Sequence, residues 1–293
     1  MKEIRFPSTL SMDYPGLLSE ALAQVMEVPY GETLTVDLTE TQRASAFGVA
    51  ALGARLAWLV AAKRLPSGSV IRRPESGRVS NDLMRMGLYS LLQEASVNIF
   101  TGDKMNERPQ ELWLVEKPAD LENAANRLVS ILRGVLPASE ADFDRVTHML
   151  QSLGDNAFRH GKVHTGAMIC GQAFPKNGVV EIAVADTGQG MWASLKRFPS
   201  MMETLQGDAN AILTALTLKV KAADGNIRPA FLNTLLATAR KTGGEICVMS
   251  GEAALTMRGG EMRNTKVAFY PGTVVGLRLR LLTQGGIPAV LES

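Results

Sequence analysis

A stretch that reads LGDNAFRHG, residues 153–161, places four side chains of different chemistry close together. It contains the carboxylate of Asp155, the amide of Asn156, the guanidinium of Arg159 and the imidazole of His160. An amide oxygen is a suitable ligand for a hard cation such as Mg²⁺. An Asn late in a helix can equally well be a local cap for the backbone, so Asn156 taken alone indicates little.

A second stretch, VADTGQGM at residues 184–191, joins one carboxylate to two closely spaced glycines. The carboxylate of Asp186 can accept a hydrogen bond from an amino group, and Gly188 and Gly190 let the backbone approach a ligand closely. A plain turn after a strand is the alternative, because Asp and Gly are ordinary turn residues. The case for a nucleotide and its metal therefore depends on a conjunction: N-A-x-x-H-G, then D-x-G-x-G, then a final strand PGTVVGLRL.

Other common sites find less support. The P-loop pattern is absent, and so is a G-x-G-x-x-G between a strand and a helix. His160 and His164 stand four residues apart, but no third ligand is nearby, and we expect Gly161 to end the helix between them. A histidine metal site is therefore not expected.

The helix that must carry Asn156 is indicated by an apolar stripe and by its cap. The stripe consists of Phe143, Val146, Met149, Leu150, Leu153 and Ala157. Ser139 and Asp142 form an S-x-x-D capping pair before it. The same periodicity places Ser152, Asn156 and His160 on one polar line.

The remaining patterns predict an α/β protein in two halves. In the first half we expect a strand at 33–40, a helix at 47–63, a strand at 67–74 and a helix at 79–95 capped by Ser80 or Asn81. In the second half we expect strands at 111–116, 166–174, 179–186, 244–251 and 272–282, with helices at 119–136 and within 192–242. Such an order is typical of helices grouped against an antiparallel or mixed sheet.

Composition limits the class of protein. The 293 residues suffice for two domains, and a hydrophobic fraction of 46% is that of a folded globular chain. A formal charge of +2 argues against nucleic acid as the main partner. We expect Cys170 and Cys247 to be buried, reduced thiols, and the apolar run from Ala46 to be a buried helix and not a membrane span. The N-terminus lacks the apolar core of a signal peptide, so we expect a cytoplasmic protein without membrane contacts.

With these motifs in order, residues 120–283 resemble the ATP-binding domain of the gyrase, heat-shock chaperone, histidine kinase and mismatch-repair superfamily. The stretch DNAFRHG is most similar to that of the anti-sigma-factor protein kinases. The resemblance implies ATP and Mg²⁺ as cofactors, with Asn156 holding the metal and Asp186 receiving the adenine amino group. It also implies nucleotide contacts from His160, Gly161, Gly188, Gly190, Met191 and Thr273.

Two departures from that family stand out. Catalytic members carry a Glu one helical turn before the Asn, where this chain has Ser152. Serine cannot act as a general base at its ordinary pKa, and Asp155 is about 100° around the helix from Asn156. The family's glycine-rich lid is replaced by DGNIRPAFLN, in which Gly225 and Asn226 could keep part of the lid. Lys219, Lys221 and Arg228 are weak candidates for phosphate contacts, since charges in a loop are usually only solvated.

The first half resembles, more loosely, the STAS fold of anti-sigma-factor antagonists. That family carries a phosphorylatable serine in a D-S-x-G turn, but here SAFG places Ser45 and Ala46 at the Asp and Ser positions. An unrelated α/β domain with the same order of elements is the alternative.

The sequence therefore predicts a STAS-like α/β interaction domain over 1–110, then an α/β sandwich of the histidine kinase-like ATPase type over 111–293. The expected function is that of an ATP-binding regulatory protein whose bound nucleotide alters its contacts with a protein partner. Hydrolysis would be slow or absent. An active ATPase or serine/threonine protein kinase and a scaffold without nucleotide are the alternatives, and a homodimer is possible.

Overall fold

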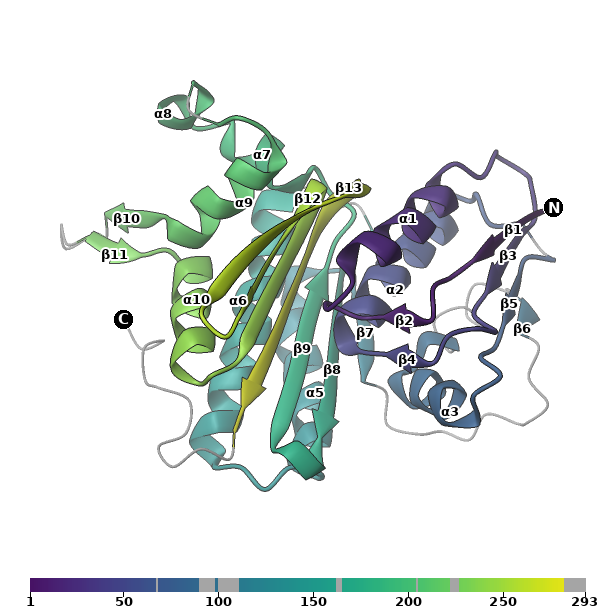
Figure 1. Cartoon of the computed structure of the whole chain (residues 1–293), viewed down its shortest axis with the longest axis horizontal. Coiled ribbons are helices and arrows are strands. Elements are labelled where there is room, and N and C mark those ends of the chain that lie inside the picture. The colour runs from purple at the N-terminus through teal and green to yellow at the C-terminus, as the bar shows by residue number, and fades with distance from the viewer. Residues whose placement is uncertain are drawn as a thin grey trace.

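The chain forms an α/β structure with two parts side by side, as the computed structural model in Figure 1 shows. The structure describes residues 1–66, 68–89, 98–99, 111–161, 165–203, 205–221 and 227–281, and the side chains of 98–99, 200, 220–221 and 227–229 are not described. The predicted α/β class is confirmed, whereas the STAS-like and histidine kinase-like architectures stay predictions. The predicted domain limit at 110 lies outside the described residues, so the division itself stays a prediction.

The N-terminal part is built on a parallel sheet in the order β1-β3-β5-β6. Its strands are β1 (Lys2–Arg5), β3 (Leu34–Asp37), β5 (Val70–Arg72) and β6 (Asn98–Ile99). A small pair is formed by β2 (Thr9–Leu10) and β4 (Arg43–Ala44). The helices are α1 (Pro15–Met26), α2 (Ala46–Ala61) and α3 (Gly77–Met86).

The predicted cap of α3 is wrong. The helix begins at Gly77 after Ser76, so that neither Ser80 nor Asn81 is the cap. The backbone N–H of Ser80 already donates to the carbonyl oxygen of Ser76, at 2.9 Å. Ser80 therefore lies within the first helical turn, and the second half of the predicted helix lies outside the described residues.

The C-terminal part is a five-stranded antiparallel sheet in the order β12-β13-β9-β8-β7. Its strands are β7 (Leu112–Val115), β8 (Ala167–Phe174), β9 (Val179–Ala185), β12 (Glu245–Arg258) and β13 (Glu261–Arg280). Its longer helices are α5 (Leu121–Arg133), α6 (Glu140–Gly161), α9 (Asp208–Thr217) and α10 (Phe231–Lys241). Shorter elements are η1 (Pro118–Asp120), η2 (Pro175–Asn177), α7 (Gly190–Leu195), α8 (Pro199–Met202), β10 (Lys219–Lys221) and β11 (Ile227–Pro229).

The helix that carries Asn156 has the predicted cap and stripe. The hydroxyl of Ser139 donates to Asp142 Oδ2 at 2.7 Å, and the backbone N–H of Asp142 donates to Ser139 Oγ at 3.2 Å. The buried residues of α6 include the whole predicted stripe, and α6 ends at Gly161. These two signals fix the register in which the α6 side chains face the sheet.

The hairpin of β12 and β13 is longer than predicted. The expected strands at 244–251 and 272–282 extend toward each other and meet at Gly259 and Gly260, whose φ values are 57° and 85°. Two adjacent residues with positive φ are typical of a tight hairpin turn, so this Gly-Gly pair was the sequence signal for the extension. The ribbon is held from the side by α1, where the backbone N–H of Ala268 donates to Ser19 Oγ at 3.0 Å.

Both faces of the antiparallel sheet are buried. On β9, Val180, Ile182 and Val184 face the helices α5, α6, α9 and α10, while the alternate residues Ala183 and Ala185 belong to the cluster that contains α1 and α2. Helix α2 thus lies between the antiparallel sheet and the parallel sheet (Figure 1). It is the predicted buried helix, and among the described residues no helix has the length and apolar character to cross a membrane.

The start of α2 meets the antiparallel sheet through a buried carboxylate. Glu181 on β9 is 0% exposed, and its Oε1 accepts a hydrogen bond from the backbone N–H of Phe47 at 3.0 Å. Its Oε2 accepts two hydrogen bonds from the guanidinium of Arg278, at 2.8 and 3.1 Å. A Cβ on Gly276 would lie 2.6 Å from the Phe47 ring, so the ring occupies the space that a side chain there would need.

Removing this carboxylate tests whether the two parts unfold as one body. Glu181→Ala leaves Arg278 and the first turn of α2 without their buried partner, which should cost about 3 kcal/mol of unfolding free energy. We expect one cooperative transition in urea, shifted to lower concentration. Glu3→Ala is the control, because its ion pair with Arg72 is exposed and should contribute about 0–1 kcal/mol. Two separate transitions in the wild type, with only one shifted by Glu181→Ala, would contradict a shared core.

Candidate functional site

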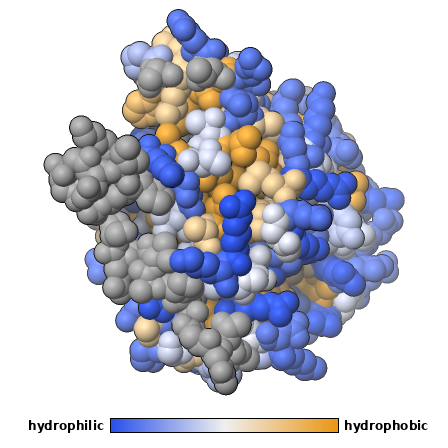
Figure 2. Space-filling model, turned by 60° about the vertical axis from the view of Figure 1, so that its left-hand side comes forward, coloured by the Kyte–Doolittle hydropathy of each residue, from blue (hydrophilic) through white to orange (hydrophobic). Residues whose placement is uncertain are grey.

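A cavity of about 290 Å³ opens between α6, α7, α9, α10 and the strands β9 and β13. All of the predicted nucleotide contacts except Gly188 line it, namely Asn156, His160, Gly161, Asp186, Gly190, Met191 and Thr273. The rest of the wall is mainly apolar, with Leu195, Phe198, Leu218 and Phe231 among its residues. On the face turned forward in Figure 2, apolar surface is bordered by hydrophilic side chains.

Asp186 lies at the end of β9 and is held by its neighbours. Its backbone N–H donates to the carbonyl oxygen of Thr273 at 2.9 Å. Its Oδ1 accepts a hydrogen bond from the backbone N–H of Gly188 at 2.7 Å, which turns the chain back toward α6. The carboxyl group is only 4% exposed but lies in the cavity wall.

The two glycines of D-x-G-x-G have different tasks. A Cβ on Gly188 would lie 2.0 Å from the carbonyl oxygen of Gly161, so this glycine allows the turn to pack against the end of α6. Gly190 has a backbone φ of 77°, which residues other than glycine rarely adopt, and it is the first residue of α7. Gly188 therefore packs against the end of α6 and does not line the cavity, whereas Gly190 lines it.

Ser250 is a site residue that the sequence analysis missed. Its hydroxyl donates to the carbonyl oxygen of Gly272 at 2.8 Å and accepts a hydrogen bond from the backbone N–H of Met191 at 2.9 Å. The hydroxyl of Thr273 donates to Ser250 Oγ at 3.3 Å. Ser250 thus joins β12, β13 and α7, and its only sequence signal was a polar residue at the end of the predicted strand 244–251.

On α6, the cavity is lined by Leu153, Asn156, Ala157 and His160. The side chain of Asn156 makes no hydrogen bond to another described residue, so its amide oxygen could serve a ligand or a metal. Ser152 is not among the lining residues, although it lies one turn before Asn156. Asp155 forms an ion pair with Arg159, at 2.7 Å from Oδ2 to Nε, and is likewise not a lining residue.

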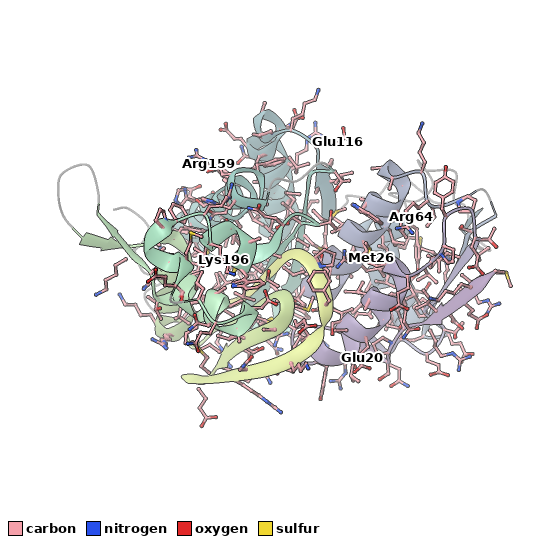
Figure 3. All side chains as sticks on the ribbon, turned by 90° about the horizontal axis from the view of Figure 1, so that it is seen from above. Glu20, Met26, Arg64, Glu116, Arg159 and Lys196 are labelled. Carbon is pink, nitrogen blue, oxygen red and sulfur yellow. The ribbon has the colours of Figure 1, made fainter. Side chains whose placement is uncertain are left out.

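Two cations near the cavity contact other side chains, Arg159 with Asp155 and Lys196 with Trp192. Arg159 and Lys196 are both labelled in Figure 3, and the ammonium group of Lys196 lies 4.0 Å from the centre of the Trp192 ring. Lys219 is exposed on β10. Gly225, Asn226 and the side chains of Lys221 and Arg228 lie outside the described residues, so the predicted lid and its phosphate contacts stay predictions.

The imidazole of His160 favours its neutral form. Burial is the main cause that lowers its pKa, and the positive charges of Arg197 and Arg159 lower it further, while Asp155 raises it. His164, the other histidine considered for a metal, lies outside the described residues. Within those residues no group of three His, Cys, Asp or Glu side chains is placed to hold a metal ion.

The thiols of both cysteines are free and buried, as predicted. Burial raises the pKa of Cys247 to about 12 and that of Cys170 well above its ordinary value. Thiols held in this protonated form contribute packing to the strands β8 and β12 and are poor nucleophiles.

Burial also raises the pKa of Asp186, from an ordinary 3.8 to about 7. Hydrogen bonds from the Gly188 and Thr273 backbone and the positive charge of Arg55 oppose this rise. The folded protein therefore binds a proton at Asp186 that the unfolded chain has already released above about pH 4. Asp186 should stabilise the fold most at low pH and progressively less as the pH rises toward 7.

Asp186→Asn should remove this pH dependence. Between pH 4.5 and 6.5 the unfolding free energy of the wild type should fall, relative to that of the variant, by about 1 kcal/mol per pH unit. Urea denaturation at several pH values measures the difference. Asp155→Asn changes a carboxylate on the same side of the fold and should keep the wild-type slope. Parallel curves for Asp186→Asn and the wild type would show that Asp186 titrates near its ordinary pKa.

Comparison with known proteins adds no assignment to this geometry. No protein-family model matches the chain, and no curated protein matches it.

Proposed function

We propose that this protein binds ATP with Mg²⁺ in the cavity between α6, β9 and β13, and that the bound nucleotide changes its contacts with a protein partner. The observation that carries the proposal is the convergence of Asn156, Asp186 and Thr273 on one cavity from three distant segments. Each segment had been singled out by a motif of the gyrase, chaperone, histidine kinase and mismatch-repair superfamily.

The chemistry of the wall suits an adenine base. An ionised Asp186 accepts a hydrogen bond from the exocyclic amino group, and the Thr273 hydroxyl lies in the same wall. Leucine and phenylalanine side chains provide apolar surface for the faces of the base. These features support recognition of a planar heterocycle that carries an amino group.

The amide oxygen of Asn156 fits a Mg²⁺ ion that is shared with phosphate oxygens. Mg²⁺ prefers oxygen ligands, keeps several waters and is usually bound by one or two protein groups together with substrate phosphates. When bound, the ion would neutralise charge on the phosphates. The cavity-facing position of Asn156 is compatible with that limited role.

The proposed protein is a regulatory binder, with an active ATPase or serine/threonine protein kinase as the second candidate. Ser152 has no carboxylate, and Asp155 is engaged with Arg159 outside the cavity wall. This supports slow or absent hydrolysis. The two buried, free thiols suit the reducing cytoplasm, which we propose as its location. The proposed protein partner includes a second copy of this chain, which would form a homodimer.

Calorimetric titration of ATP in the presence of Mg²⁺ tests the binding site. At pH 8, where Asp186 is ionised, Asp186→Asn places an amide donor opposite the amino donor of adenine. The loss should be about 1–3 kcal/mol, which corresponds to roughly 5- to 150-fold weaker binding. Asp155→Asn is the matched control and should bind like the wild type. Equal affinity of Asp186→Asn and the wild type would refute the assignment of adenine to Asp186.

The same titration assigns the metal. Asn156→Ala should bind ATP with an affinity that no longer depends on Mg²⁺, since the variant lacks the proposed ligand oxygen. A variant with the full metal response of the wild type would show that Asn156 has a structural role only. If the wild-type protein gives no binding heat with ATP or with any other adenine nucleotide, the result would favour a scaffold that needs no nucleotide.

Ser152→Glu tests why hydrolysis should be slow. General-base assistance typically contributes ~10²–10⁴-fold in rate, so the natural protein should show ATP turnover near background. A glutamate at 152 reaches farther than serine from one turn before Asn156, and we expect a measurable gain in phosphate release. Ser152→Gln has a similar size without a base and should show no gain. Brisk hydrolysis by the pure wild type, unaffected by changes at 152, would instead support the enzyme.

A further inference from the structure

Arg55, in the middle of α2, is a fully buried cation. Its side chain is 0% exposed, and its guanidinium lies over the ring of Tyr270 at 4.0 Å from the centroid. Neither Nε nor the two terminal nitrogens has a hydrogen-bond partner among the described residues. A guanidinium stays protonated in proteins, so this charge needs compensation from its surroundings.

The ring of Tyr270 lies against the guanidinium, and the segment that carries Tyr270 adjoins Asp186. Tyr270 and Gly272 belong to β13, and a Cβ on Gly272 would lie 2.2 Å from the carbonyl oxygen of Asp186, so the two segments touch directly. The charges of Arg55 and Asp186 act on each other, and both act on the buried Tyr270 hydroxyl. Arg55 thus contacts a ring two residues from Gly272, the residue whose backbone packs against Asp186.

Few other charged groups act on Asp186. Arg55 comes from α2, Tyr270 from β13, and His160 of α6 lines the same cavity in its neutral form. From α7, α9 and α10, no charged side chain is among the described lining residues. Within the part of the chain that the structure describes, Arg55 is the cation whose charge lowers the pKa of Asp186.

We propose that Arg55 is a positioning residue of the nucleotide site, which favours the ionised form of the Asp186 carboxyl group from the opposite face of the sheet. The cation belongs to the N-terminal part, none of whose described residues lines the cavity. The identity of the ligand rests on the proposed function, whereas the link between Arg55 and Asp186 does not. It follows that the seating of α2 on the sheet sets the fraction of molecules able to bind the base.

Coupling of this kind is reciprocal. If seated α2 favours the ionised carboxylate that the ligand needs, then bound ligand favours seated α2 by the same factor. The N-terminal part would therefore respond to occupancy of a cavity that it does not touch. This provides a physical route from nucleotide binding to the surface of the N-terminal part.

The ionisation of Asp186 can be measured without any nucleotide. In protein labelled with ¹³C at aspartate carboxyl groups, the resonance that is missing in Asp186→Asn belongs to this residue. In Arg55→Met its titration midpoint should rise by about one pH unit. Arg55→Lys keeps the charge and should stay near the wild type. Arg64→Met removes another arginine that lies over a ring, at 5.5 Å from Trp58, and should leave the midpoint unchanged.

Arg55→Gln is the second neutral variant, which retains polar donors and should show the same rise even if Arg55→Met fails to fold. An unchanged midpoint in a folded neutral variant would overturn the proposal. So would an equal rise in Arg55→Lys, because the effect would then follow the shape of the side chain and not its charge.

Nucleotide binding provides the functional readout. If the titration midpoint of Asp186 rises from about 7 to about 8, the ionised fraction of this carboxyl group at pH 7 falls about fivefold. The neutral variants should therefore bind ATP about fivefold more weakly at pH 7 and almost normally at pH 9. In an Asp186→Asn background the change at Arg55 should have no effect on affinity. If the wild type binds no ATP but the midpoint moves, the proposed function fails and the link stands. If ATP binds and the midpoint does not move, the link fails alone.

Discussion

The burial of α2 between two sheets is the constraint from which most of this architecture follows. A helix that is apolar on nearly every side must be covered on every side, and α2 is covered by the parallel sheet and by the antiparallel one. The antiparallel sheet in turn must present an apolar second face, which β9 does with alanines opposite its larger residues. Small side chains at these positions allow the helix to approach the strands closely. The two parts of the chain consequently share one hydrophobic cluster.

Charges are carried into this shared core at two places along α2. At its first turn Glu181 is matched by Arg278 and by a backbone N–H, so all partners are direct. Farther along, Arg55 lies over the ring of Tyr270, and none of its side-chain nitrogens has a hydrogen-bond partner among the described residues. The first arrangement is a structural ion pair, whereas the second leaves the ionisation of the Asp186 carboxyl group sensitive to small movements. The two pairs also differ in where they lead, because only the second reaches the cavity.

Local signals in the sequence were sufficient for much of the fold. The stripe and the Ser139 cap identified α6, and β-branched residues identified the strand at 33–40, which contains β3, because each signal lies within a few neighbouring residues. The start of α3 was misjudged by a few residues, as Ser76 and Ser80 are equally good caps in isolation. No local pattern in the sequence indicates that α2 packs against a strand such as β9, which lies more than a hundred residues away in the chain. The strand order also depends on such distant pairings.

The same distinction explains which parts of the site were predictable. Asn156, Asp186 and Gly190 stand in short motifs whose spacing is visible in the sequence, and they meet in the cavity. Phe198 and Phe231 also line it, but an apolar residue that faces a ligand looks the same in sequence as one that faces the core. Ser250 and Arg55 carry no motif, since their roles arise from contacts made across the sheet.

Asp186 shows how such a site opposes the stability of its own fold. Its burial favours the protonated carboxyl group, whereas an adenine amino group would require the ionised one. A fully exposed aspartate would avoid the conflict but would also be hydrated, and a hydrated acceptor discriminates poorly among ligands. The burial of Arg55 is unfavourable for the opposite reason, because the guanidinium cannot release its charge. The two unfavourable burials offset each other only while α2 remains on the sheet. The stability of that contact and the readiness of the cavity therefore depend on the same two charges.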